Sequence, residues 1–148
     1  MPLTIPAFVH LDLAAGDRVQ ATQILAQSLL DDDRLSDLDA FLADVRDREE
    51  KMLTALPGAV AIPHSRSAHV RKAGLAFGRS ADGIDWGGPD GPTRLVFLIA
   101  VPDSGHTDHL AVLAKLARRL TRPSFRQALL TLDDPAAVSD LLTEQLGA

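Results

Sequence analysis

The segment Leu95–Val101 is uninterrupted in its apolar character and reads Leu-Val-Phe-Leu-Ile-Ala-Val. Successive side chains of a β-strand point to opposite faces of the sheet, so a strand that is apolar throughout has to be covered on both faces. The run therefore predicts a central strand over residues 94–101. Pro102 should end it, because proline cannot donate a hydrogen bond to the next strand.

The remaining sequence predicts further strands that alternate with helices. Short apolar runs favour strands at residues 9–13, 60–62 and 74–78. Apolar residues at helical spacing predict helices with N-caps at Asp17, Ser36 and Thr107, and further helices over 125–130 and from Asp134 or Pro135 to about Leu146. The segment 82–92 is dense in Gly, Pro and Asp and predicts a loop, which Trp86 would anchor against the core.

Length and composition limit the class of protein. A chain of 148 residues with 46% hydrophobic residues is expected to form a single soluble domain. It has no cysteine, which excludes disulfides and thiolate chemistry and fits a cytoplasmic location. Residues 1–58 carry 5 Lys/Arg against 11 Asp/Glu, a balance that argues against nucleic acid as a partner. No apolar run approaches the roughly 20 residues that span a bilayer, so direct membrane insertion is not expected.

Glu49 stands in an unexpected position on the second predicted helix. At about 100° per residue it falls in the middle of the apolar stripe, with Arg48 at the edge of that stripe. A carboxylate that points inward normally has a partner. Two interpretations remain open from the periodicity alone: a structural ion pair, or support for a functional site.

The five histidines are candidates both for metal ligands and for reactive groups. The pairs His64/His69 and His106/His109 lack the spacing and the carboxylates of a metal site, so no metal is predicted. His10 and His69 are expected at the surface. His64 follows the apolar run that Pro63 ends, and His109 opens a predicted helix on its buried face. Neutral imidazole is a nucleophile near pH 7, and a helix N-terminus suits phosphate, so both residues indicate phosphoryl transfer.

These residues belong to a wider pattern. The chain resembles the fructose/mannitol-type enzyme IIA domains of the bacterial phosphoenolpyruvate-dependent sugar phosphotransferase system, from about Leu3 to Leu142. The resemblance implies an α/β (α+β) fold over residues 1–148, a single IIA type 2 domain with a central mixed sheet flanked by helices. The residues that carry it are Arg48-Glu49, Thr54, Gly58, Val60-Ala61-Ile62-Pro63-His64, Ile84-Asp85-Trp86, Asp90-Gly91, Leu95 to Pro102 and His109-Leu110.

The resemblance implies a cytoplasmic phosphocarrier that needs no cofactor. Phosphorylated HPr would donate to Nε2 of His64, and the phosphoryl group would pass to a cysteine of a IIB domain and then to sugar entering through a membrane IIC component. Arg48 and His109 would stabilise the phosphoryl group. Thr54 and Ser65 would add hydroxyl donors, and Glu49 would hold Arg48 or the chain around it.

The sequence also departs from the family, and other functions remain open. Pro57 replaces an expected glycine or alanine before the histidine, and Ser65 stands where glycine, alanine or cysteine is usual. Proline fixes φ, so the shape of this loop is expected to differ. One alternative is a regulatory protein like the nitrogen-branch IIA proteins, which bind and modulate other proteins. Another is an interaction module without catalysis. The sequence does not identify the sugar.

Overall fold

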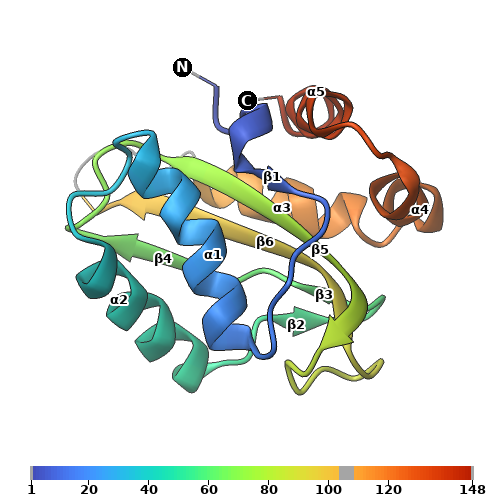
Figure 1. Ribbon diagram of the computed structural model, residues 1–148, viewed down its shortest axis with the longest axis horizontal. Helices are drawn as coiled ribbons and strands as arrows, with labels where there is room; N and C mark the ends of the chain where they lie inside the picture. Colours follow the sequence, from blue (N-terminus) through green and yellow to red (C-terminus); the bar gives the residue numbers. More distant parts are fainter. Residues whose placement is uncertain (1, 104–108, 148) are drawn as a thin grey trace.

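The computed structural model describes residues 2–103 and 109–147, and the side chains of His109 and Leu110 are not described. Within these ranges, five α-helices and six strands follow one another along the chain (Figure 1). Together with one 3-10 helix, they are η1 (Pro6–Phe8), β1 (Val9–His10), α1 (Arg18–Asp31), α2 (Leu38–Lys51), β2 (Ala55–Leu56), β3 (Val60–Ala61), β4 (His64–Ser67), β5 (Gly74–Ile84), β6 (Thr93–Pro102), α3 (His109–Arg119), α4 (Pro123–Thr131) and α5 (Pro135–Leu146).

The six strands form one mixed sheet in the order β1-β5-β6-β3-β2, with β4 also paired to β6. β5 and β6 make a long antiparallel hairpin, whereas β1 runs parallel to β5 and both β3 and β4 run parallel to β6. β6 therefore has neighbours along both edges. This confirms the central strand that the apolar run predicts, and it confirms the mixed sheet.

Helices cover both faces of the sheet. Val96 and Leu98 of β6 pack with α1 and α2, and Leu95, Phe97 and Ile99 pack with α3, α4 and α5. Figure 1 shows α1 in front of the sheet and α3 behind it. The alternation of β6 side chains between two separate hydrophobic clusters explains why every position of this strand is apolar. Among the described helices, none is long and apolar enough to cross a membrane.

Several boundaries were predicted correctly and others were wrong. The Asp17 side chain accepts a hydrogen bond from the Gln20 N–H and caps α1, as predicted. The cap of α2 is Asp37, whose Oδ1 accepts from the Ala40 N–H at 3.1 Å, and not Ser36. Ser36 instead donates its N–H to the carbonyl of His69, which ties the start of α2 to the segment after β4.

Four further predictions need correction. The strand predicted over 9–13 is only two residues long, and the strand predicted over 74–78 continues to Ile84, because the hairpin with β6 extends its pairing. α4 begins at Pro123, since proline is tolerated in the first turn of a helix. His10 and His69 are half-buried and not surface residues. Thr107 and His106 lie outside the described residues.

Candidate phosphoryl-transfer site

His64 is the first residue of β4 and lies beside the central strand. Val60 pairs with Leu95 and His64 pairs with Ile99, so β3 and β4 follow β6 in a single register. The ladder is interrupted at Ile62-Pro63, although the carbonyl of Pro63 still accepts from the Ile99 N–H at 3.0 Å. The prediction that Pro63 ends a strand is therefore confirmed for β3, but a second strand starts at the very next residue.

The imidazole of His64 is held by one hydrogen bond. Its Nδ1 lies 2.8 Å from the carbonyl oxygen of Ile62. A carbonyl oxygen can only accept, so Nδ1 carries the proton and Nε2 of the neutral ring carries the lone pair. The tautomer follows from the partner of Nδ1. His64 is half-buried, so part of the residue is exposed to solvent.

The register of β4 against β6 determines the face of the sheet to which the His64 side chain points. Directly paired residues of parallel strands point to the same face, and Ile99 belongs to the cluster packed by α3, α4 and α5. His64 therefore points to the side of the sheet on which α3 begins, at His109. The described residues do not include the His109 side chain, so its contact with His64 stays a prediction.

Glu49 supports the segment that leads to His64. It is only 7% exposed, and its two oxygens accept from the backbone N–H and the hydroxyl of Thr54, both at 2.6 Å. The carbonyl of Thr54 in turn accepts from the Ile62 N–H at 3.1 Å, and the Ile62 carbonyl holds His64. We call this chain of contacts the Glu49–Thr54 strut. Glu49 makes no ion pair with Arg48 among the described contacts, so its partner is the chain around the site.

The hydroxyls of Thr54 and Ser65, predicted to be phosphate donors, are directed elsewhere in the structure. Thr54 uses its hydroxyl proton for the bond to Glu49. Ser65 follows His64 in the strand, so its side chain points to the opposite face. That is the face of Ser67, whose hydroxyl donates to Asp44 of α2 at 2.5 Å.

Arg48 lies in the last turn of α2, which packs over β4. Its side chain is half-buried, and Nη1 is 3.4 Å from the Met52 carbonyl. Asp44, one helical turn earlier, is bonded to Ser67 at the far end of β4. α2 and β4 run in opposite directions in Figure 1, which brings Arg48 to the His64 end of the strand. No described strand pairs with the outer edge of β4. Contact between the Arg48 guanidinium and His64 stays a prediction.

The turn that contains Pro57 is fixed by residues that the sequence analysis did not assign to it. The Gly58 N–H donates to Oδ2 of Asp90 at 2.6 Å, and the Arg126 side chain packs against Gly58. β3, which follows this turn, starts at Val60, four residues before His64. Four residues of a strand span about 13 Å. The departure at Pro57 is therefore distant from the imidazole.

Known proteins match this chain over most of its length. A family model described as "Phosphoenolpyruvate-dependent sugar phosphotransferase system, EIIA 2" matches residues 4–145. A "PTS system fructose-specific EIIA component" of Haloferax volcanii is 37% identical over 137 residues, which cover 92% of this chain and 89% of that protein. A "PTS system fructose-specific EIIABC component" of Bacillus subtilis is 35% identical over 112 residues, which are 75% of this chain but only 18% of that longer protein.

Solved structures show the same fold. The nitrogen regulatory protein IIA-Ntr of Neisseria meningitidis superimposes with a TM-score of 0.87 at 30% identity, covering 95% of this chain and 97% of that one. The mannitol IIA protein of Escherichia coli superimposes with a TM-score of 0.76 at 23% identity, covering 92% and 96%. The family model over residues 4–145 and the 37% identity to the Haloferax volcanii protein show that the chain belongs to the EIIA 2 family of the phosphoenolpyruvate-dependent sugar phosphotransferase system.

Proposed function

We propose that His64 is the phosphoryl acceptor of this phosphotransferase component and that Nε2 is the reacting atom. The observation that carries the proposal is the hydrogen bond from Nδ1 to the Ile62 carbonyl. It leaves the nucleophilic lone pair on the other ring nitrogen, Nε2. Since a nucleophile must approach phosphorus in line with the leaving group, a ring fixed by a neighbouring carbonyl is already oriented for attack.

The reaction needs few groups from the protein. The Nε2 lone pair attacks phosphorus of phosphorylated HPr, and the donor's P–N bond breaks with its electron pair returning to the donor imidazole. The His64 ring keeps its Nδ1 proton and gains positive character, so its hydrogen bond to Ile62 strengthens as the new bond forms. In the second step a cysteine thiolate of a IIB domain attacks phosphorus, and the electron pair of the P–Nε2 bond returns to His64.

Arg48 and His109 are the groups we propose to stabilise the phosphoryl oxygens. Arg48 has a planar fork of donors that matches phosphate, and no carboxylate pairs with it among the described residues. Thr54 acts in this scheme through the Glu49–Thr54 strut and not as a phosphate donor. Ser65 likewise makes no contact with the phosphoryl group, because its side chain points away from the His64 face.

The partners in this proposal are HPr as donor, a IIB domain as acceptor and a membrane IIC component reached only through IIB, with the reactions taking place in the cytoplasm. The names of the Haloferax volcanii and Bacillus subtilis relatives, both fructose-specific, support fructose as the sugar. A second candidate, modulation of other proteins, is favoured by the 30% identity to a nitrogen regulatory IIA protein. Transfer to IIB distinguishes the two, because only transport requires it.

Intact-protein mass spectrometry tests the acceptor. The wild type is incubated with phosphoenolpyruvate, enzyme I and HPr, beside His64→Ala and the control His69→Ala, which removes a half-buried imidazole from the segment after β4. We expect one acid-labile phosphoryl group on the wild type and on His69→Ala and none on His64→Ala. Labelling of folded His64→Ala would overturn the assignment. Adding a fructose IIB domain should then discharge the labelled wild type.

A further inference from the structure

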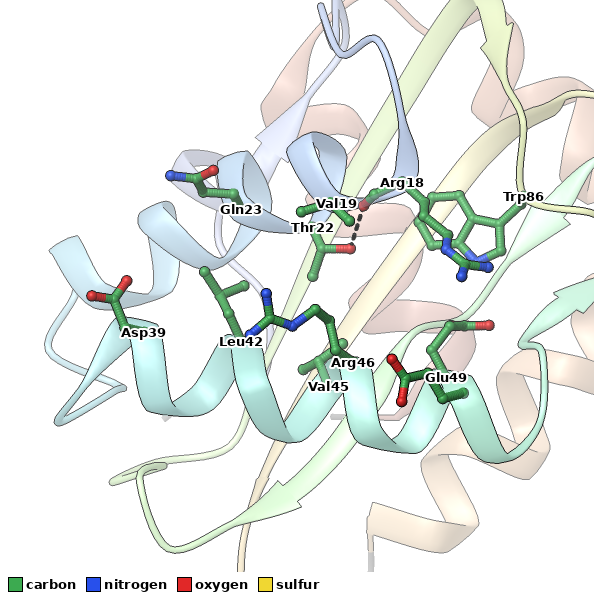
Figure 2. Close-up of a pocket in the computed structure, with 11 residues that line it drawn as sticks. Arg18, Val19, Thr22, Gln23, Asp39, Leu42, Val45, Arg46, Glu49 and Trp86 are labelled. Atoms are coloured by element: carbon green, nitrogen blue, oxygen red, sulfur yellow. Dashed lines mark hydrogen bonds between the residues drawn. The ribbon is translucent and has the colours of Figure 1, made fainter.

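A cavity of about 420 Å³ lies between α1 and α2 (Figure 2). These helices cover the face of the sheet opposite to the one that His64 shares with Ile99. Its volume falls within the range of small-molecule sites. Leu42 and Val45 of α2 give it an apolar wall, and Trp86 closes one end. The phosphoryl-transfer scheme leaves this cavity without a role.

The cavity presents donors that have no acceptor. Trp86 is 1% exposed, and its Nε1–H has no hydrogen-bond partner among the described residues. A buried polar group without a partner normally costs stability, so an orphaned indole N–H beside a cavity indicates an absent acceptor. The guanidinium of Arg18 lies beside Trp86 at the same end of the cavity in Figure 2, and no carboxylate in the described part of the chain pairs with it.

The same cavity presents acceptors. Glu49 lines it from α2, near Trp86 and Arg18 in Figure 2. Each oxygen of Glu49 accepts one bond from Thr54, and each has a second lone pair left to accept another. A cation beside Glu49 would compensate a carboxylate that is only 7% exposed and has no ion-pair partner among the described residues.

We propose that this cavity binds a small zwitterion of the α-amino-acid class. The ligand carboxylate accepts from the Trp86 Nε1–H and from Arg18, its ammonium group donates to Glu49, and its side chain packs on Leu42 and Val45. The lining carries charges of both signs: Arg18 and Arg46 are cationic, and Asp39, Glu49 and Glu50 are anionic. At the Trp86 end a zwitterion pairs with both Arg18 and Glu49, whereas a simple carboxylic acid leaves Glu49 without a cation from the ligand and a simple amine leaves Arg18 without an anion.

Trp86 is the only tryptophan of the chain, so its indole N–H gives a single resolved signal in a proton–nitrogen NMR spectrum. The test titrates the labelled wild-type protein with each common amino acid to about 10 mM, which detects affinities in the millimolar range. We expect at least one amino acid to shift the indole signal saturably. The carboxylic acid and the amine that share its side chain should each bind about tenfold more weakly, since each loses one charged hydrogen-bonding group.

Arg18→Gln and the control Arg118→Gln complete the test. Arg118 is exposed in the last turn of α3 and does not line the cavity. Arg18→Gln should weaken binding about tenfold, and Arg118→Gln should leave it unchanged. The proposal is overturned if no amino acid shifts the indole signal, if the amine or the acid binds as tightly as the amino acid, or if Arg18→Gln binds like the wild type. None of these readouts requires phosphoryl transfer, so they stand apart from the role of His64.

Discussion

Replacing Thr54 by valine tests the Glu49–Thr54 strut. The substitution keeps the branched shape and the backbone N–H of Thr54 and removes only the hydroxyl, which donates to Glu49 at 2.6 Å. A hydrogen bond to a charged group contributes about 1.5–3 kcal/mol. Thr54 and Glu49 are each 7% exposed, so water replaces the lost donor poorly. We therefore expect the free energy of unfolding to fall by about 2 kcal/mol.

Urea denaturation monitored by far-ultraviolet circular dichroism measures this loss. The urea midpoint should decrease while the slope of free energy against urea stays the same, because the surface exposed on unfolding hardly changes. For a chain of this size the melting temperature should fall by roughly 4–8 °C. The matched control is Thr131→Val in α4, whose hydroxyl donates at 2.9 Å to a neutral carbonyl in an exposed position.

Two results would refute the reasoning on the strut. The first is a loss for Thr54→Val no larger than that for Thr131→Val. The second is additivity in a double-mutant cycle between Glu49→Gln and Thr54→Val, because residues joined by a hydrogen bond in a buried site should show a coupling free energy of about 0.5–3 kcal/mol.

Three further predictions concern other parts of the chain. Arg48→Gln should slow phosphoryl acceptance from HPr about tenfold in rapid-quench experiments and leave the free energy of unfolding nearly unchanged, since a half-exposed guanidinium contributes little to folding. Burial lowers the pKa of His10 below 6.5, so stability should be lost as the pH falls below 6.5, and His10→Asn should remove that part of the pH dependence. Gly58→Ala should destabilise the protein more than Gly91→Ala. Both glycines have positive φ, but a Cβ at Gly58 would lie 2.9 Å from the Arg126 side chain, whereas a Cβ at Gly91 would meet no atom within 4 Å.

Each of these predictions has a contrary outcome. An unchanged rate for Arg48→Gln would remove Arg48 from the site. For His10, the unfolded chain binds a proton near pH 6.5 and the folded chain binds it only at lower pH, so protonation favours unfolding. If His10→Asn leaves the slope of the free energy of unfolding against pH unaltered between about pH 7.5 and 5, the burial argument is wrong. Equal urea midpoints for Gly58→Ala and Gly91→Ala would mean that the Arg126 contact adds no cost.

Local sequence patterns were sufficient to predict the elements whose signal lies within a few neighbouring residues. The apolar run at Leu95–Val101 predicted a central strand because both of its faces are buried, and Asp17 predicted the start of α1 because its side chain caps a backbone N–H three residues on. The inward position of Glu49 also followed from helical periodicity alone. These features depend on residues close together in sequence.

The site itself depended on contacts between distant segments. β4 reads His-Ser-Arg-Ser, which has no strand pattern, and it is extended only because it continues beside β6. The proton on Nδ1 of His64 is set by the Ile62 carbonyl, and Ile62 is tied through its own N–H to Thr54 and so to Glu49 on α2. The cavity lined by Arg18 and Trp86 likewise joins segments far apart in the chain.

Local patterns were therefore enough to predict the central strand and the start of α1, and the family motif pointed to His64 as the candidate acceptor. Burial periodicity and helix caps are local signals, and a family motif can be recognised from the order of the residues. Contacts between distant segments were needed to establish the tautomer of His64, the partner of Glu49 and the face to which Ser65 points. The physical reason is that hydrogen bonds and strand register join atoms whose separation in space is not encoded by their separation along the chain.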